Sequence, residues 1–243
     1  MKLKKRDCVS FAAFLLVLAL NSCGARGAVV PAQNDAGHIP NLTVWDETNR
    51  QNSLPEMLRE AGNGPVILLP VYTRCTMSCP VLAAKLKAET ARMMYGQSYR
   101  VLLFSFDPSE DAASLRGFRE REKLPGKWML VRAEETDIRR FSDFFHYSIM
   151  ADGAMFVHPN QIFLLDHTLR WRATIIGVDW DATELGKWMQ RVEAPGILGW
   201  VAMNPEKLVW IGFGGLLLSL VGAMGWLLWR KPPAVEGAGT EKA

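Results

Sequence analysis

The strongest structural signal in the chain is Val66-Ile67-Leu68-Leu69-Pro70-Val71-Tyr72-Thr73-Arg74-Cys75-Thr76-Met77-Ser78-Cys79-Pro80. Its first six residues form an apolar run with the length of a strand that is buried on both faces of a sheet. Two cysteines follow, four positions apart, at the predicted start of a helix. The helix dipole and the free N–H groups at such a position stabilise a thiolate. Paired thiolates suit either a reversible disulfide or a copper(I) or zinc ion, and the segment alone leaves both chemistries open.

Strand and helix patterns alternate on both sides of these cysteines. Apolar runs predict strands at 42–45, 66–71, 100–106, 127–131, 162–165 and 169–176. Apolar periodicity and N-cap residues predict helices at 53–62, 81–95, 109–123, 135–147 and 181–193. The alternation indicates an α/β fold, and the short turn between the last two strands makes its central sheet mixed. The thiols then lie at the carboxyl end of a central strand, where open α/β sheets usually bind ligands.

The amino terminus has the pattern of an export signal, which we predict at residues 1–23. Basic residues precede an apolar run at 11–20 that is too short to span a bilayer, and small residues follow. Leu20-Asn21-Ser22-Cys23 resembles the bacterial lipoprotein signal, in which Cys23 is lipidated and becomes the mature amino terminus. An ordinary cleavage near Cys23 or Ala25 is the alternative. In both cases Cys8 lies in the segment that is removed.

A second apolar segment predicts a transmembrane helix at residues 208–229. It contains no charged residue and has the length that a hydrocarbon core of about 30 Å requires. Tryptophans near both ends fit interfacial anchors, and Arg230-Lys231 fits a cytoplasmic end, with residues 230–243 as a cytoplasmic tail. We predict a linker at 24–41 and a folded domain at 42–195. That domain should face the periplasm from the bacterial inner membrane.

This topology restricts the roles of the charges and the cysteines. The net charge of +3 comes partly from basic clusters at the two ends, so no basic face for nucleic acid is predicted. Of four cysteines, only Cys75 and Cys79 remain in the predicted exported domain. A scaffold held together by disulfides would carry several spaced cysteines. The single close pair therefore indicates a chemical function rather than a structural one.

Three motifs in chain order resemble the SCO/SenC family, the thioredoxin-like copper chaperones of cytochrome c oxidase assembly. Residues 72–80 resemble the CxxxCP motif, Ser105-Phe106-Asp107-Pro108 resembles the DP motif after the following strand, and Val157-His158 resembles the family's histidine before a strand. Together these landmarks span about residues 42–193, nearly the whole predicted domain. The resemblance implies a thioredoxin-like fold, to which the sequence adds the transmembrane helix.

The resemblance also implies a function. Cys75, Cys79 and His158 would bind one copper ion, and the chain would be a membrane-anchored metallochaperone for the copper-bearing subunit of cytochrome c oxidase. Such a protein binds its cargo rather than turning over a substrate. It needs a copper donor or a thiol reductant, neither of which the sequence identifies. The donor chemistry agrees, because copper(I) is soft and favours thiolate and imidazole ligands.

The chain has three other histidines with weaker reasons to be ligands. His146 lies in an aromatic helical run and is expected to pack, and His167 lies in a hairpin turn and is expected to be solvated. His38 belongs to the predicted linker and would be a flexible third ligand. His158 itself has a structural alternative, as a capping or hydrogen-bonding residue before a proline.

Four residues near the motifs are candidates to support the site. Met77 offers a thioether as an additional soft ligand, and Arg74 stands where it could lower the pKa of the first thiol. Asp107 is a candidate supporting residue whose alternative role is that of a turn or helix-cap aspartate. Pro159 resembles the cis-proline that faces the thiols of redox-active thioredoxins, although a trans turn proline is the simpler interpretation.

Two departures from the family pattern keep a second function open. Thr76 follows Cys75 where many family members have proline, and Pro159 directly follows His158. The second hypothesis is a thiol-disulfide oxidoreductase that keeps a partner's copper-ligating cysteines reduced. One cysteine would attack as thiolate and the other would resolve the mixed disulfide. A thioredoxin-class peroxidase is a third hypothesis, which is less consistent with a CxxxC pair that is expected to close on itself.

Overall fold

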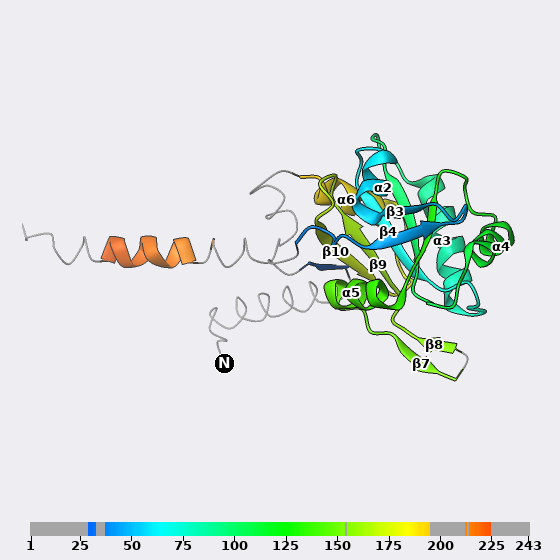
Figure 1. The fold of residues 1–243 in the computed structure, drawn as a ribbon. Coiled ribbons are helices and arrows are strands. Elements are labelled where there is room, and N and C mark those ends of the chain that lie inside the picture. The colour runs from blue at the N-terminus through cyan, green and yellow to red at the C-terminus, as the bar shows by residue number, and fades with distance from the viewer. Residues whose placement is uncertain (1–28, 33–36, 154, 195–211, 213, 225–243) are drawn as a thin grey trace, which may run out of the picture. The chain divides into compact units, whose positions relative to one another are not determined.

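A mixed eight-stranded sheet organises the amino-terminal unit of the chain in the computed structural model (Figure 1). The structure describes residues 29–32, 37–153, 155–194, 212 and 214–224. The chain divides into two compact units, Met1–Ala194 and Pro195–Ala243, and the sheet belongs to the first. In spatial order its strands are β1 (Val29–Pro31), β10 (Trp171–Ile176), β9 (Gln161–Leu165), β4 (Val66–Val71), β5 (Arg100–Ser105), β6 (Met129–Ala133), β2 (Thr43–Asp46) and β3 (Gln51–Ser53).

The central strands β4, β5 and β6 are parallel, and the other pairs in this sheet are antiparallel. Every residue of β4 and β5 is buried, which agrees with the continuous apolar run at 66–71. The two strands pair in register from Val66 opposite Arg100 to Val71 opposite Ser105. They therefore end together at one edge of the sheet, where the Phe106 N–H donates to the Val71 carbonyl at 3.0 Å. This edge brings the cysteine segment and the DP motif side by side.

Helices flank the sheet, which confirms the predicted α/β, thioredoxin-like architecture (Figure 1). Asp111 and Asp181 cap their helices as expected, because their side chains accept from the N–H groups of Ser114 and Glu184. Ser53 does the same for the N–H of Glu56. The helices of this unit in the described residues are α2 (Leu54–Glu60), α3 (Ser78–Arg92), α4 (Ala112–Glu122), α5 (Glu135–Phe145) and α6 (Ala182–Val192).

Aromatic side chains of α5 form much of the core on one side of the sheet. Phe141 stacks on Phe104 of β5, with ring centroids 4.2 Å apart, and Phe145 stacks on Phe163 of β9 at 4.3 Å. All four side chains are at most 2% exposed. Burying a side chain of this size is worth roughly 1.5–3 kcal/mol. The helix is thus held firmly over β5 and β9, close to the ends of the strands that carry the predicted site.

Three short strand pairs were not expected from the sequence, and one of them is the pairing of β3 with β2. β1 lies inside the predicted linker at 24–41 and pairs with β10, with Val29 opposite Ile175, so part of that linker extends the sheet. Strands β7 (Met150–Asp152) and β8 (Met155–Val157) form a separate hairpin that projects from the body of the unit (Figure 1). Helix α5 ends at Phe145, two residues before the predicted end, because His146 adopts a left-handed conformation.

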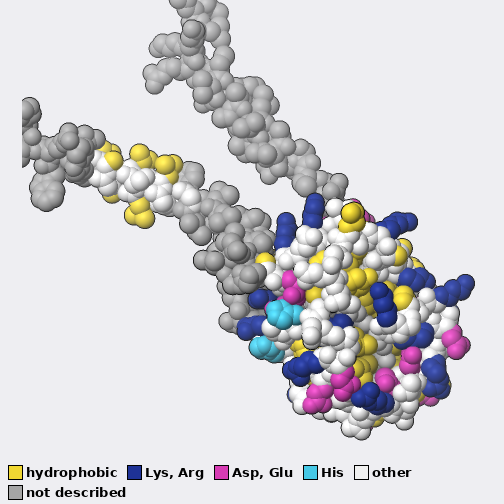
Figure 2. Space-filling view, turned by 90° about the horizontal axis from the view of Figure 1, so that it is seen from above, with side chains coloured by type: hydrophobic (Ala, Val, Ile, Leu, Met, Phe, Trp, Pro, Cys, Tyr) yellow, Lys and Arg dark blue, Asp and Glu magenta, His cyan; other side chains and the backbone are white. Residues whose placement is uncertain are grey.

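Charged side chains of both signs are interspersed on the face of the molecule shown in Figure 2. Among the described residues, side chains of opposite charge also form ion pairs, such as Arg119 with Glu47 at 2.6 Å and Arg50 with Glu60 at 2.9 Å. This mixture of positive and negative side chains agrees with the modest net charge of +3.

In the second unit, residues 212 and 214–224 are helical. Among the residues that the structure describes, no helix is both long and apolar enough to cross a membrane. The predicted span at 208–229 extends beyond the described residues at both ends. The predicted signal peptide at 1–23, Cys8, Cys23 and the predicted tail at 230–243 lie outside them.

Candidate metal centre

Cys75 and Cys79 lie where β4 leads into α3. The Cys75 N–H donates to the Tyr72 carbonyl at 3.2 Å and closes a turn directly after the strand. Helix α3 begins at Ser78, so Cys79 lies in its first turn, and the predicted position of the thiols at a helix N-terminus is confirmed. The N-cap residue, Met77, makes no side-chain cap bond. Instead, the Cys79 N–H donates to Cys75 Sγ at 3.4 Å, so the first cysteine takes up a free donor of the helix.

Three possible ligand atoms converge at this point. Cys75 Sγ, Cys79 Sγ and a ring nitrogen of His158 all lie within 4.8 Å of one another. Cys79 Sγ is 3.7 Å from His158 Nε2, and Ser78 Oγ lies 3.5 Å from the same nitrogen. Both thiols are free and buried, with Cys75 4% and Cys79 0% exposed. The structure thus brings together the three residues predicted as copper ligands.

The environment of Cys75 favours the thiolate. Burial raises the pKa of its thiol, but hydrogen bonds from the backbone N–H groups of Cys79 and Met77 outweigh that effect, and the pKa lies below its ordinary value. The side chains of Cys79 and Tyr72 also donate to this sulfur and lower the pKa further. These donors stabilise negative charge on Cys75 in the same way as a helix N-terminus stabilises a bound anion.

The environment of Cys79 favours the neutral thiol. Burial raises the pKa of Cys79 far above its ordinary value, and the nearby charge on Cys75 raises it further. The two thiols therefore differ sharply in proton affinity, although they are only four residues apart. When such a pair loses its first proton, the remaining negative charge is stabilised on Cys75 and the remaining proton stays on Cys79.

His158 reaches the thiols from the segment between β8 and β9. Its ring contacts Phe106 and Tyr72 edge to face, with centroids 5.1 and 5.9 Å away. Burial lowers the pKa of its imidazole below the ordinary value, partly offset by a hydrogen bond to the Pro159 carbonyl. The ring is therefore neutral at neutral pH, which is the form that binds metal ions.

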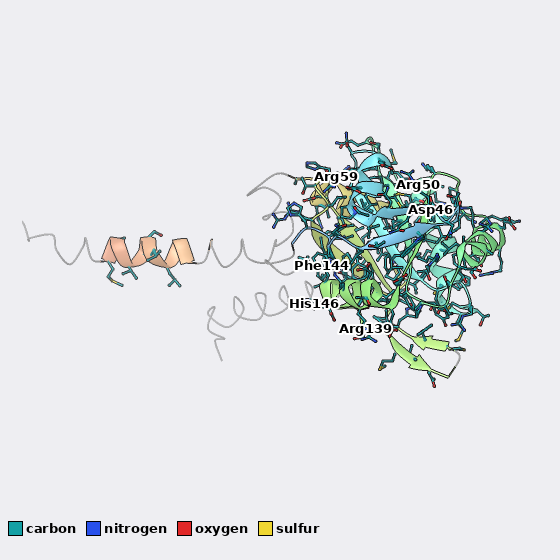
Figure 3. The ribbon with its side chains drawn as sticks, viewed as in Figure 1. Asp46, Arg50, Arg59, Arg139, Phe144 and His146 are labelled. Carbon is teal, nitrogen blue, oxygen red and sulfur yellow. The ribbon has the colours of Figure 1, made fainter. Side chains whose placement is uncertain are left out.

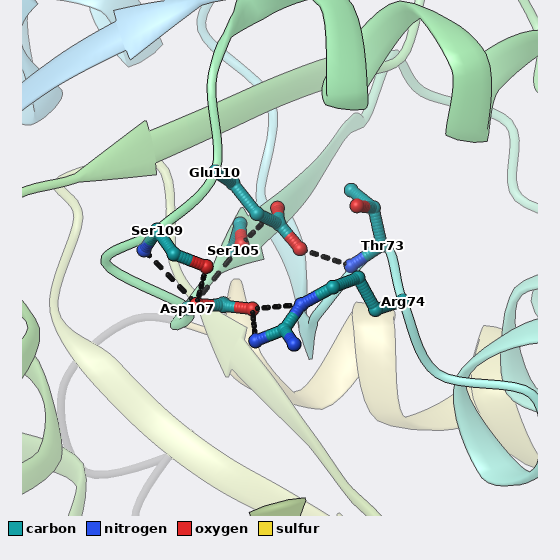
Figure 4. Close-up of polar contacts among 6 residues, drawn as sticks. All are labelled: Thr73, Arg74, Ser105, Asp107, Ser109 and Glu110. Atoms are coloured by element: carbon teal, nitrogen blue, oxygen red, sulfur yellow. Dashed lines mark hydrogen bonds and ion pairs between the residues drawn. The ribbon is translucent and has the colours of Figure 1, made fainter. Parts of the chain in front are cut away.

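A buried carboxylate network supports the chain just before Cys75 (Figure 4). Glu110, which is 5% exposed, accepts from the Thr73 N–H and from Ser105 Oγ. Asp107, which is 1% exposed, accepts from Arg74 Nε at 2.8 Å and from Nη2 of the same guanidinium. Arg74 therefore binds the Asp107 carboxylate. The network anchors the β4–α3 segment to the end of β5.

Asp107 has the role of a turn residue as well as an anchor. Its Oδ1 accepts from the Ser109 N–H at 3.0 Å and from Ser109 Oγ at 2.6 Å. Burial raises the pKa of the Asp107 carboxyl, but the bonds from Ser109 and Arg74 outweigh that effect and lower it. The prediction that Asp107 supports the site without binding the metal remains consistent with these contacts.

Met77 and Pro159 lie next to the predicted ligands in the chain and contact the centre through their backbones. The Met77 side chain is 67% exposed, and it is the Met77 backbone N–H that bonds to Cys75. Among the described residues no peptide bond is cis, so the bond before Pro159 is trans, which is the simpler of the two sequence interpretations. The Pro159 carbonyl, rather than its ring, contributes to the site by accepting hydrogen bonds beside His158.

The other histidines lie apart from the thiols. His146 follows the last residue of α5 and contacts Trp171, with ring centroids 6.0 Å apart (Figure 3). His167 Nδ1 pairs with Glu193 at 2.9 Å, and His38 forms an isolated bridge with Arg170. None of the three belongs to the cluster of possible metal ligands found in the described residues.

Comparisons with known proteins give the fold a name. No protein-family model and no curated protein matches the chain. Among solved structures, one from Aquifex aeolicus VF5, proposed to act in electron transfer, is 25% identical and matches 60% of this chain and 87% of its own, with a TM-score of 0.55. A SCO1/SenC family lipoprotein from Bacillus anthracis str. Ames is 15% identical, and the match covers 67% of this chain and 96% of the lipoprotein with a TM-score of 0.54. ScoI from Arabidopsis thaliana with copper bound is 14% identical, and the match covers 68% of this chain and 95% of ScoI with a TM-score of 0.53. The domain has the SCO/SenC fold.

Several residues around the centre of this SCO/SenC fold were not found from the sequence. Tyr72 and Tyr147 contact the His158 ring, and Ser78 lies beside Nε2. Tyr72 stands within the quoted motif, so its position could have indicated a contact with the thiols. Tyr147 was placed in a helix, and only the left-handed turn at His146 directs it to the centre.

Proposed function

We propose that this chain is a SCO/SenC protein that binds one copper(I) ion through Cys75, Cys79 and His158. The observation that supports it is the convergence of two thiols and an imidazole within 4.8 Å, at the edge of the sheet where α/β proteins bind ligands. Two sulfurs and one nitrogen match the preference of copper(I) for soft ligands and low coordination number. Burial of both thiols limits access of water and oxygen to the bound ion.

The protonation of the site fits a metal that binds thiolates. The pKa of Cys75 is lowered and His158 is neutral, so the proton that is hardest to remove when the ion binds is that of Cys79, whose pKa is raised. Copper(I) would supply a positive charge that stabilises both thiolates, so binding would release protons from the thiols. The chain itself contributes the hydrogen bonds that hold Cys75 and His158 in place.

We further propose that the domain is anchored in the bacterial inner membrane and faces the periplasm. The helix predicted at 208–229 and the signal at 1–23, with or without a lipid on Cys23, would supply the anchor. The SCO1/SenC family structure from Bacillus anthracis is described as a lipoprotein, which supports the lipid alternative. The client would be the copper-bearing subunit of cytochrome c oxidase, and the copper would come from a separate donor.

A copper(I) titration of the reduced full-length protein under anaerobic conditions tests this proposal. A competing copper(I) chelator of known affinity measures both stoichiometry and affinity. We expect one tightly bound ion per chain, lost in Cys75→Ala and Cys79→Ala and strongly weakened in His158→Ala. His167→Ala is the matched control, because its imidazole is more than half exposed and pairs with Glu193. Binding that ignores His158 would contradict the proposed ligand set.

The asymmetry of the two thiols favours thiol-disulfide exchange as a second candidate function. Cys75, with its lowered pKa, would attack a partner disulfide, and one partner sulfur would leave as a thiolate and take up a proton. Cys79 would then lose its proton and attack Cys75 Sγ, forming the Cys75–Cys79 disulfide and releasing the second partner thiol. Two electrons pass to the partner, and a thiol reductant must restore the pair.

The two functions separate at His158. We expect His158→Ala to lose tight copper binding and to retain reduction of a peptide that contains one intramolecular disulfide. Cys75→Ala should lose both activities. If His158→Ala keeps copper binding and loses peptide reduction, the thiol-exchange function is the better assignment.

A further inference from the structure

Tyr147 reaches His158 because of how α5 ends. His146 adopts a left-handed conformation, with φ 50° and ψ 41°, and the Tyr147 N–H donates to the Ser142 carbonyl at 2.9 Å. This bond closes the end of the helix in the manner of a C-cap and turns the chain sharply. The Tyr147 ring then enters the core, where it is 3% exposed and contacts Phe106 and Phe163. The position of its hydroxyl is therefore fixed by the packing of α5.

The Tyr147 hydroxyl forms a triangle of polar contacts with His158 Nδ1 and the Pro159 carbonyl. The hydroxyl oxygen is 2.8 Å from Nδ1 and donates to the Pro159 carbonyl at 3.2 Å. Nδ1 is itself 3.2 Å from that carbonyl. The opposite ring nitrogen, Nε2, faces Cys79 Sγ and Ser78 Oγ. The two nitrogens of one ring thus meet different partners, one set fixed by Tyr147 and the other at the metal centre.

Of the two neutral tautomers of His158, only the one that carries its proton on Nδ1 satisfies all three groups of the triangle. A carbonyl oxygen accepts hydrogen bonds and cannot donate them, so Pro159 requires a donor. If Nδ1 carries the proton, it donates to the Tyr147 oxygen, and the Tyr147 hydroxyl donates to Pro159. If Nδ1 is unprotonated, Tyr147 must donate to it, and the Pro159 carbonyl then receives a proton from neither group. An acceptor left unpaired at this half-buried site costs free energy.

We propose that Tyr147 is a positioning residue that holds His158 in the Nδ1–H tautomer and leaves the Nε2 lone pair directed at the thiols. The inference deepens the proposed copper function, on which its second readout rests. In the other tautomer, Nε2 would carry a proton and could not bind a metal ion without rearrangement. Partners of the second ring nitrogen commonly set tautomer and orientation in this way for metal-bound histidines.

The first test reads the tautomer directly in the copper-free, reduced full-length protein. The chain contains four histidines, so histidine-selective 15N labelling gives few resonances, and His158→Ala identifies those of His158. The 15N shifts distinguish a protonated from a bare ring nitrogen. We expect Nδ1 protonated and Nε2 bare in the wild type, and a mixture of both tautomers in Tyr147→Phe. A wild-type His158 that carries its proton on Nε2 would overturn the proposal without reference to copper.

The second test is a double-mutant cycle for copper(I) affinity. Tyr147→Phe retains the buried ring and should weaken binding by about 10- to 100-fold, the usual effect of losing such a partner. In the His158→Ala background the same change should have no effect on the residual binding by two thiolates. Tyr99→Phe is the matched control, because that hydroxyl donates to the Thr90 carbonyl, away from the site, and should leave affinity unchanged.

The outcomes separate this inference from the proposed function. An equal loss of affinity from Tyr147→Phe with and without His158 would mean that Tyr147 acts through packing, and the inference would be wrong. Unchanged tautomer and unchanged affinity in Tyr147→Phe would overturn it as well. If the wild type binds no copper, the proposed function fails, while the tautomer measurement still tests the role of Tyr147.

Discussion

Asp107→Asn tests whether the carboxylate network supports the thiol segment without belonging to the ligand set. One oxygen of Asp107 accepts from the Ser109 N–H and hydroxyl, and the other from two nitrogens of Arg74. An asparagine retains only one acceptor oxygen. Because the bond from the Ser109 N–H closes a local turn two residues along the chain, we expect the amide oxygen to stay there and the NH2 group to face Arg74. The two bonds to the guanidinium are then lost.

The cost can be worked out from these contacts. A hydrogen bond to a charged group contributes roughly 1.5–3 kcal/mol. The Arg74 side chain is 49% exposed, so water can take the place of the lost Asp107 acceptor. We therefore assign about 1 kcal/mol to each of the two lost hydrogen bonds. We therefore expect Asp107→Asn to lower the free energy of unfolding by ~2 kcal/mol. With a urea dependence of about 1–3 kcal/mol per molar, the midpoint should fall by about 1 M.

Urea unfolding of the reduced full-length protein, followed by tryptophan fluorescence, measures this change. Asp111→Asn is the matched control, since its remaining oxygen still accepts from Ser114 and the residue lies on the surface. We expect the control to change stability by less than about 0.5 kcal/mol. Copper stoichiometry should remain one per chain in both variants. Equal stability of Asp107→Asn and wild type would refute the network reasoning, and loss of copper binding at full stability would make Asp107 part of the ligand set.

The effect of Asp107→Asn on stability should also depend on pH. The pKa of the Asp107 carboxyl is lowered in the folded protein, against an ordinary value of 3.8. A lowered carboxyl pKa contributes stability that is present above the unfolded value and is lost as the pH falls through the folded value. The difference in stability between wild type and Asp107→Asn should therefore be complete above pH ~5 and shrink below 3.8. A constant difference from neutral pH down to acid unfolding would contradict the assignment of the charge to Asp107.

Two further predictions concern the thiols and the core. Iodoacetamide should modify Cys75 before Cys79 at neutral pH, because the pKa of Cys75 is lowered and that of Cys79 is raised. Tandem mass spectrometry locates the label. Earlier reaction at Cys79 would contradict the difference between the two thiols. Phe141→Ala should lower the free energy of unfolding by about 3–5 kcal/mol, because it leaves a cavity beside Phe104 in the core. A loss below about 1 kcal/mol in urea unfolding would contradict the described packing of α5 against the sheet.

The sequence predicted the elements whose signals are local. The apolar runs at 66–71 and 100–106 gave β4 and β5, and Asp111 and Asp181 marked the starts of their helices. The convergence of both thiols with His158 also followed, because the order of motifs resembled a known family. These features depend on composition and spacing within a few residues or on a recognisable motif.

The features that were missed depend on contacts between distant residues. Val29–Pro31 forms a strand only because β10 offers it an edge, and Glu110 is buried because Thr73 and Ser105 donate to it. The β7–β8 hairpin has exposed residues and no apolar alternation, so its sequence carried no strand signal. His146 is not a glycine, and its left-handed conformation, which directs Tyr147 to the site, had no marker in the sequence.

X-ray absorption spectroscopy of the copper(I)-loaded, reduced full-length protein tests the central proposal most directly. The geometry of Cys75, Cys79 and His158 predicts one copper ion with two sulfur ligands and one imidazole nitrogen. In His158→Ala the nitrogen contribution should disappear while both sulfurs remain. A spectrum with three sulfur ligands, or one that is unchanged by His158→Ala, would contradict the proposed centre.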